Sequence, residues 1–169
     1  NKCVQGFPGV SFVLFREKEL KRLREIPERT LYLNLAGYHK AQEAGGILFT
    51  PAIPAYYALN FALDELIEET VIGRIKRYAK AAQLLRTGFR QIGLEFLIPE
   101  NWQSNCLTSL RLPKDLSYEK LHDELKANGF VIYAGQGNLS ENIFRVANMG
   151  DITHKEFEQF LKTLESILL

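Results

Sequence analysis

The first residues that could do chemistry are a lysine and the small residues that follow it. Lys2 precedes a loop that contains Gly6, Pro8 and Gly9, and this loop leads into the apolar run Val10–Phe15. The run has the length and composition of a buried β-strand. A lysine held on a loop against such a strand would be partly desolvated, which favours a neutral, nucleophilic amine. We therefore predict that Lys2 is a reactive amine; the alternative is a solvated surface charge.

A threonine and an arginine supply two further polar groups in apolar surroundings. Thr50 precedes Pro51 and a stretch of helical periodicity, so its hydroxyl and N–H could bind an anion or cap the helix. Arg145 lies within Ile143–Val146, an otherwise apolar predicted strand, and an unpaired guanidinium is costly to bury. Its planar fork fits a carboxylate ligand. The alternative is an edge-strand arginine in solvent or paired with Asp151.

Length and composition are those of a globular protein. The chain has 169 residues, of which 46% are hydrophobic and 24% are charged, enough for one domain or one and a half small ones. Its net charge of +1 gives no field that would favour nucleic acid or an anionic membrane. We find no signal peptide and no membrane span. The two cysteines suit a reducing, cytoplasmic setting, and no metal site is expected, because no cysteine or histidine has ligand spacing: Cys3, Cys106, His39, His122, His154.

Periodicity and capping signals predict the secondary structure. Helices are expected over 17–25, within 30–44, and over 53–69, 71–92, 117–128 and from Thr153 onward, where Glu156 completes a capping box. Strands are expected over 106–112, 130–133 and 143–146, in addition to Val10–Phe15. The order strand–helix–strand–strand–helix after residue 105 predicts a small α+β domain with its helices on one sheet face.

The predicted helix over 71–92 is strongly basic and contains no acid. It could be a nucleic-acid surface. We favour a solvated face that balances the acidic end of the helix before it, because no interleaved aromatic residues or basic tail support binding.

The spacing of Lys2, Gly9, Ser11 and Val13 resembles the lysine signature of the class V pyridoxal-phosphate-dependent aminotransferases. The fuller string Asn-Lys-Cys-Val-Gln-Gly-Phe-Pro-Gly looks closest to the branch of 2-aminoethylphosphonate–pyruvate aminotransferases. The stretch 144–151 is similar to the Phe-Arg-x-x-x-x-Gly-Asp stretch of that family, and residues 129–133 also match.

Two features depart from the family pattern. Ala134 stands where a proline is expected before Gly135, and the loop over 136–142 has no match. These departures concern the identity of the substrate more than the class of reaction.

The resemblance implies an α/β fold, the C-terminal half of a fold type I enzyme. Residues 1–69 would then be the remnant of the large cofactor-binding domain, and residues 70–169 a long helix and a small α+β domain. Lys2 would carry pyridoxal 5'-phosphate and transfer a proton. Thr50 would contact the cofactor phosphate of the neighbouring subunit in a homodimer, and Arg145 would grip the substrate α-carboxylate.

The implied reaction is transamination of 2-aminoethylphosphonate with pyruvate, which yields phosphonoacetaldehyde and alanine. The acid on the pyridine nitrogen and the stacking aromatic are expected upstream, so we expect this polypeptide alone to be inactive. One alternative is another class V enzyme, such as an alanine– or serine–glyoxylate aminotransferase. A cysteine desulfurase is disfavoured, because its cysteine needs a mobile loop and Cys106 lies in a predicted strand.

A third alternative is a non-catalytic interaction module, which would be a stable monomer. We expect self-association instead, through apolar surface that a missing half-domain would leave exposed.

Overall fold

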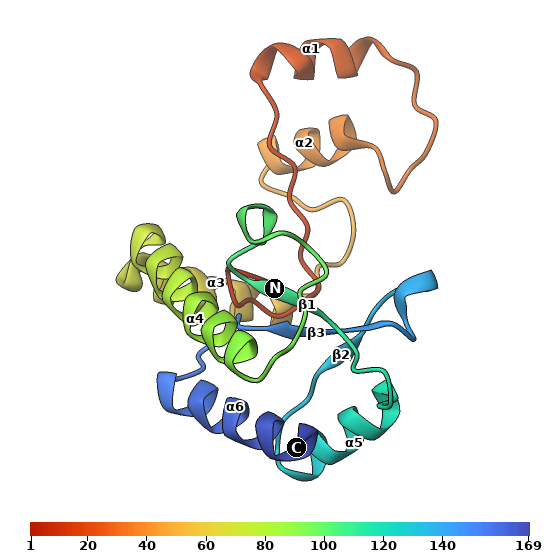
Figure 1. The fold of residues 1–169 in the computed structure, drawn as a ribbon. Helices are drawn as coiled ribbons and strands as arrows, with labels where there is room; N and C mark the ends of the chain where they lie inside the picture. Colours follow the sequence, from red (N-terminus) through yellow and green to blue (C-terminus); the bar gives the residue numbers. More distant parts are fainter. The chain divides into compact units, whose positions relative to one another are not determined.

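The computed structural model describes residues 1–169 and divides into two compact units, one formed by residues 1–5 and 63–169 and the other by residues 6–62. Figure 1 labels the elements along the chain. The helices are α1 (Glu17–Glu25), α2 (Leu35–Glu43), α3 (Ile53–Glu69), α4 (Val71–Gln91), α5 (Tyr118–Ala127) and α6 (His154–Leu168). The strands are β1 (Leu107–Arg111), β2 (Tyr133–Ala134) and β3 (Ile143–Ala147), and short 3-10 turns cover Glu100–Trp102 and Gly137–Leu139. The predicted domain bounds, 1–69 and 70–169, stay a prediction.

The sheet of the first unit is antiparallel, with β3 in the centre between β1 and β2. Leu110 lies opposite Phe144, and Thr108 lies opposite Val146. These four residues are buried and share one face, because residues directly opposite in an antiparallel pair point the same way. The sheet thus has one face turned to a core.

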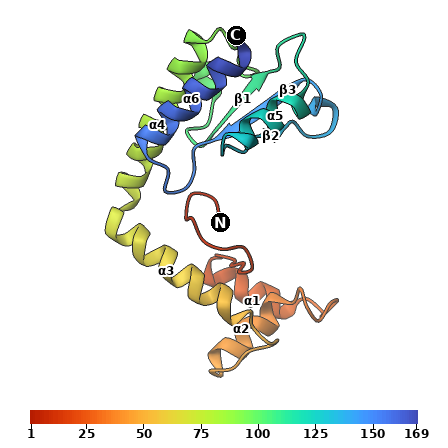
Figure 2. The ribbon, with the colours of Figure 1, turned by 90° about the horizontal axis from the view of Figure 1, so that it is seen from below.

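Three helices cover that face. Figures 1 and 2 show α5 and α6 beside the sheet, with α4 running next to α6. Their apolar residues form one core with the sheet, to which the helices contribute Leu85, Phe89, Leu121, Leu125, Phe157, Phe160 and Leu164. The predicted order strand–helix–strand–strand–helix and the single covered face are both present.

The helix bounds follow the local signals closely. The side chain of Ser117 accepts from the backbone N–H of Lys120 at the start of α5. Thr153 and Glu156 form the predicted capping box at the start of α6. Gly129 follows α5 with φ +88°, a left-handed conformation that favours glycine.

The predicted strand over Val10–Phe15 is wrong. This segment has no regular secondary structure, and most of its apolar side chains are exposed, including Phe12 at 73% and Leu14 at 88%. A strand requires a neighbour to satisfy its backbone groups, and none of the three strands pairs with this segment. Composition alone predicted a strand that has no partner here.

Two other predicted strands have different bounds. β2 begins at Tyr133, three residues after the predicted start at Phe130, because only Tyr133 and Ala134 lie opposite β3. Cys106 lies in a turn just before β1 instead of within the strand. Strand bounds are set by the partner strand, which the local sequence does not contain.

The second unit, residues 6–62, has a small core. Helices α1 and α2 pack together, and Glu43 of α2 pairs with Arg24 of α1 at 3.0 Å. The rings of Tyr32, Tyr38 and Phe49 cluster, with the Tyr32 and Phe49 centroids 5.3 Å apart. Few apolar side chains of this unit are buried.

Candidate active site

Lys2 lies in a tight turn and is exposed. The turn closes where the backbone N–H of Gln5 donates to the carbonyl of Lys2 at 3.0 Å. Gln5 has φ +62°, a left-handed conformation that costs energy for a residue with a side chain. The expected desolvation of Lys2 by a following strand is absent, because Val10–Phe15 forms no strand. What positions Lys2 is therefore the turn itself.

Side chains of helix α4 anchor this turn through hydrogen bonds. The guanidinium of Arg74, only 4% exposed, donates to the carbonyls of Cys3 at 3.1 Å and Val4 at 3.4 Å. The Gln5 side-chain amide donates to the Tyr78 hydroxyl at 2.8 Å. These bonds offset the strain at Gln5 and fix the backbone that carries Lys2.

The carboxylate of Glu69 holds Arg74, which anchors the turn, and also Arg77 of the same helix. It contacts Arg74 Nε at 2.5 Å and Arg77 Nε at 2.6 Å. Hydrogen bonds first from Arg77 and then from Arg74 lower the Glu69 pKa from 4.5 to about 2. Arg77 also donates to the carbonyl of Gly150 at 2.7 Å, which ties the same cluster to the turn after β3.

Asn148, which is buried, connects α4 to the end of the sheet. Its side-chain amide donates to the carbonyls of Tyr78 at 3.2 Å and Asn105 at 2.9 Å, and its backbone N–H donates to the carbonyl of Cys106 at 3.2 Å. The Tyr78 hydroxyl in turn accepts from the backbone N–H of Gly150 at 3.3 Å. A continuous set of hydrogen bonds thus runs from the lysine turn to the end of β3.

Sequence reasoning missed these supporting residues. Asn148 lies inside the family-like stretch 144–151, and that position was the one available signal. Glu69, Arg74 and Tyr78 carry no such signal, because they look like ordinary residues of amphipathic helices.

Arg145 lies on the face of the sheet opposite the core. On the central strand β3 it sits between Ser109 of β1 and Tyr133 of β2, and the pairing register places all three on that face. Its Nε donates to the carbonyl of Ala134 at 2.7 Å. Arg145 makes no ion pair in the chain, with Asp151 or any other acid, and its two terminal nitrogens have no hydrogen-bond partner. The free edge of the guanidinium can accept a planar carboxylate.

The Lys2 turn lies beside the end of the sheet where β1 begins and β3 ends, whereas Arg145 lies in the middle of β3. The sulfur of Cys3, next to Lys2, lies 3.4 Å from that of Cys106, immediately before β1. The carbonyl of Cys106 accepts a hydrogen bond from the backbone N–H of Asn148, which lies three residues after Arg145. No hydrogen bond or ion pair joins Lys2 to Arg145.

Thr50 belongs to the other unit, and it does not cap α3. The helix begins at Ile53, and the first carbonyl to accept a helical bond is that of Ala52, from Tyr56 N–H at 3.2 Å. Pro51 and Ala52 therefore separate Thr50 from the helix. Thr50 is exposed, and its hydroxyl has no partner in the chain. The capping alternative is wrong, which leaves the hydroxyl available to a ligand.

Lys2, Arg145 and Thr50 offer three kinds of polar group. A primary amine can bind an aldehyde, a guanidinium edge can bind a carboxylate, and a free hydroxyl can donate to a phosphate oxygen. In the first unit, the Lys2 amine suits the aldehyde of pyridoxal phosphate and the Arg145 guanidinium suits the carboxylate of an amino or keto acid. The Thr50 hydroxyl belongs to the second unit. The structure contains no group of three or more His, Cys, Asp or Glu side chains placed to hold a metal. None of its helices combines the length and apolarity needed to cross a membrane.

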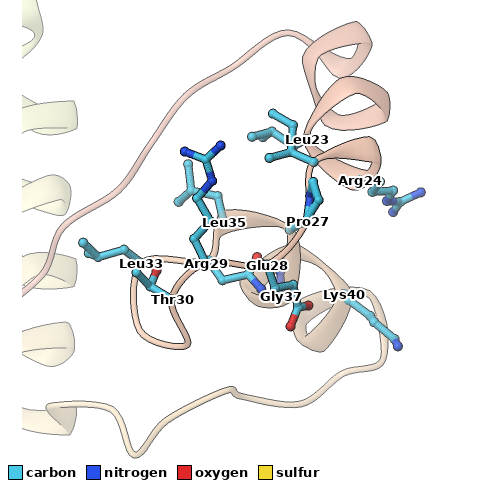
Figure 3. Close-up of a pocket in the computed structure, with 13 residues that line it drawn as sticks. Leu23, Arg24, Pro27, Glu28, Arg29, Thr30, Leu33, Leu35, Gly37 and Lys40 are labelled. Atoms are coloured by element: carbon cyan, nitrogen blue, oxygen red, sulfur yellow. Dashed lines mark hydrogen bonds between the residues drawn. The ribbon is translucent and has the colours of Figure 1, made fainter.

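A hollow of about 560 Å³ lies in the second unit, between α1 and α2. Figure 3 shows Leu23, Pro27 and Leu33 around it, together with the basic side chains of Arg29 and Lys40. None of the three predicted site residues lines this hollow.

Four of the six basic residues of α4 are engaged in the structure. Arg74 and Arg77 hold Glu69, Arg86 donates to the carbonyl of Ser104, and Arg90 pairs with Glu100. Burial lowers the pKa of Arg86, but its guanidinium keeps this carbonyl partner. The expected balance with the acidic end of the preceding helix is present at Glu69. The expected solvated face is wrong for Arg74 and Arg86, which are buried.

The comparisons with known proteins agree with the residue patterns. No protein-family model matches the chain. It is 31% identical over 171 residues to a 2-aminoethylphosphonate–pyruvate transaminase of Phocaeicola vulgatus, a match that covers 99% of this chain and 47% of the relative. It is 34% identical to a protein of the same name from Lysinibacillus sphaericus, covering 100% of this chain and 46% of that one.

A solved structure has the same fold. The ureidoglycine–glyoxylate aminotransferase of Bacillus subtilis matches with a TM-score of 0.79 at 25% identity, over 89% of this chain and 40% of that protein. The chain spans about half the length of the curated relatives it matches. In sequence and in fold, the chain resembles the class V pyridoxal-phosphate-dependent aminotransferases of fold type I.

Proposed function

We propose that the protein carrying this sequence transaminates 2-aminoethylphosphonate with pyruvate and forms phosphonoacetaldehyde and alanine. The observation that carries the proposal is Arg145, a half-buried guanidinium whose free edge meets no acid in the chain. An arginine of this kind is suited to a carboxylate that arrives from outside the chain. The two curated relatives described above bear the name of this activity.

Lys2 is the proposed catalytic residue. Its amine would hold pyridoxal phosphate and would move a proton to and from the substrate carbon that bears nitrogen. Bound pyridoxal phosphate would supply the electron sink for loss of that proton. The rigid turn, with Gln5 strained and Arg74 on the backbone, limits the positions that the amine can sample.

Arg145 is the proposed carboxylate-binding residue. In this reaction pyruvate and alanine carry a carboxylate, whereas 2-aminoethylphosphonate carries a phosphonate. The bond from Arg145 Nε to the Ala134 carbonyl fixes the plane of the guanidinium, so its two terminal nitrogens can donate side by side.

Thr50 is proposed to donate to the cofactor phosphate of the neighbouring subunit in a homodimer. Its exposed hydroxyl has no internal partner, which is consistent with an external acceptor. The homodimer and a cytoplasmic location remain parts of this proposal.

A second candidate function is another class V transamination, such as one with glyoxylate as the keto acid. It is favoured by the fold match to a glyoxylate aminotransferase and by the loop over 136–142, which departs from the phosphonate branch. A non-catalytic interaction fragment is the remaining alternative.

The test uses the full-length protein that contains this sequence. The protein is incubated with pyridoxal phosphate, reduced with borohydride and digested, and the modified residue is located by mass. The matched control is the exposed Lys18 on α1. We expect the modification on Lys2, its loss in Lys2→Ala, and no change in Lys18→Ala.

A donor panel then separates the two candidate reactions. The proposed function predicts turnover of 2-aminoethylphosphonate with pyruvate, whereas the second candidate predicts turnover of alanine or serine with glyoxylate. A modification at a residue other than Lys2, or none, overturns both reactions and leaves the non-catalytic alternative.

A further inference from the structure

The only two cysteines of the chain lie against each other although they are 103 positions apart in the sequence. Cys3 Sγ and Cys106 Sγ are 3.4 Å apart, and both thiols are free. A disulfide requires about 2.05 Å between the sulfurs, so closure needs a movement of only about 1.4 Å. The function proposed above makes no use of either thiol.

The backbone on both sides of the pair is already held in place. Arg74 donates to the carbonyl of Cys3, and Asn148 donates to the carbonyl of Cys106. The backbone N–H of Cys106 also donates to the Ser104 hydroxyl at 3.1 Å. Since the two cysteines are held in proximity by other contacts, joining their sulfurs requires little further ordering of the chain.

The two thiols differ in accessibility. Cys3 is exposed, whereas Cys106 is half-buried. Burial, together with the neighbouring Cys3, raises the pKa of the Cys106 thiol, so Cys106 stays protonated when Cys3 is attacked. Such an arrangement provides an accessible thiol that a small oxidant reaches first and a second thiol that resolves the product.

We propose that Cys3 and Cys106 are a peroxide-sensitive modification site whose disulfide clamps the Lys2 turn to the start of β1. The oxidant is hydrogen peroxide or an organic hydroperoxide. The Cys3 sulfur takes one peroxide oxygen and becomes a sulfenic acid, and the other oxygen leaves as water or alcohol. The Cys106 sulfur then attacks the Cys3 sulfur, and the sulfenic hydroxyl leaves as water with the Cys106 proton. Two thiols are oxidised by two electrons and one peroxide is reduced.

The clamp acts on Lys2 through its neighbour in the sequence. The closed disulfide would fix Cys3, and therefore the peptide that carries Lys2, to the strand beside β3. The movement of about 1.4 Å that closes the disulfide would shift the Lys2 amine from the position that the hydrogen-bonded turn gives it, and its reaction with an aldehyde would slow. This consequence rests on the proposed function of Lys2, whereas formation of the disulfide does not.

The first experiment measures the disulfide itself. The full-length protein is treated with hydrogen peroxide, remaining thiols are blocked with iodoacetamide, and tryptic peptides are identified by mass. The cross-link joins peptide 3–16 to peptide 91–111. We expect this cross-linked peptide after peroxide, and its loss after dithiothreitol.

Serine variants test the order of the two steps. In Cys106→Ser no thiol resolves the sulfenic acid, so Cys3 should proceed to sulfinic acid. In Cys3→Ser the half-buried Cys106 should remain largely a thiol. The proposal is overturned if peroxide yields no cross-linked peptide in the wild type. It is also overturned if peroxide oxidises Cys106 faster than Cys3.

The second experiment measures the effect on Lys2. The rate of borohydride-trapped modification by pyridoxal phosphate is compared in oxidised and reduced protein, with Cys106→Ser as the control that cannot close the clamp. We expect a severalfold slower rate in the oxidised wild type, restored by dithiothreitol, and no such disulfide-dependent change in Cys106→Ser. An equal rate in both wild-type forms overturns the clamp. Loss of Lys2 modification in both redox forms refutes the function of Lys2 and leaves the disulfide standing.

Discussion

At the scale of single residues, Arg145 stands out because it has no acidic partner in the chain. It is bonded through Nε to one carbonyl, and no acid of the chain neutralises it. Lysine at this position would keep the charge but lose the planar pair of donors. We expect Arg145→Lys to lower kcat/KM for the keto acid roughly 10- to 100-fold, which corresponds to about 1–3 kcal/mol for charge-assisted hydrogen bonds.

The matched control is Arg111→Lys. Arg111 is an exposed arginine on β1 that lies 3.9 Å from Glu95. This change should leave kcat/KM within about twofold, because a surface ion pair contributes little. Steady-state kinetics of the full-length variants check both expectations, and an equal loss in the two variants contradicts the assignment of Arg145.

Glu69 supports the anchoring of the lysine turn through its ion pair with Arg74. Glu69→Gln would leave the buried guanidinium of Arg74 without its carboxylate, and we expect a loss of about 2–3 kcal/mol in the free energy of unfolding. Glu68→Gln, an exposed neighbour, should change this energy by less than about 0.5 kcal/mol. Urea unfolding at pH 7 measures both.

The Glu69 pair also predicts a pH dependence. The folded-state pKa is lowered from 4.5 to about 2, so the pair contributes its full stability above the ordinary value. That contribution is lost as the pH falls from 4.5, where Glu69 of the unfolded chain becomes protonated, to about 2, where Glu69 of the folded protein becomes protonated as well. The stability difference between wild type and Glu69→Gln should therefore shrink across this window. A difference that stays constant down to pH 2 contradicts the pairing.

At the scale of elements, the contact between α4 and α6 depends on a glycine. A Cβ on Gly88 would lie 2.4 Å from Leu161 Cδ1 and 3.0 Å from its Cγ. Gly88→Ala gains helix propensity but forces Leu161 to move, and we expect a net loss of about 1 kcal/mol. Thermal unfolding measures it, with the exposed Thr87→Ala as control. The double variant Gly88→Ala/Leu161→Ala should show less than the sum of the two single losses, because the clash is gone.

Helices could be predicted from the sequence because their signals are local. Apolar periodicity, the caps at Ser117 and Thr153, and Gly129 all lie within a few residues of the bounds that they set. Strands require partners that lie far away in the sequence. Val10–Phe15 has the composition of a strand but pairs with nothing here, and β2 is only as long as its pairing with β3.

The candidate site was predictable only in part for the same reason. Lys2, Thr50 and Arg145 stand in short motifs, so the sequence could nominate them, and their roles are still proposals. The residues that hold the lysine turn, Glu69 and Arg74, are far from it in sequence. Only the folded chain shows that they meet it.

At the scale of the whole molecule, the chain leaves many large apolar side chains in solvent. Phe12 and Leu14 of the second unit are exposed, as are Val71, Ile72 and Ile75 of α4 in the first. Exposed apolar surface of this extent favours association. We expect the 169-residue polypeptide to self-associate, with a sedimentation coefficient that rises with concentration.

Two paired variants locate that association. The double substitution Phe12→Ser and Leu14→Ser removes apolar surface without touching a buried residue, because both side chains are mostly in solvent. It should shift the association to higher concentration, whereas Lys21→Ser on the exposed surface of α1 should not. Sedimentation velocity across a concentration series measures the shift. If the unmodified polypeptide sediments as a monomer at every concentration, the apolar segment is not an association surface, and the non-catalytic interaction module, which predicts a stable monomer, gains support.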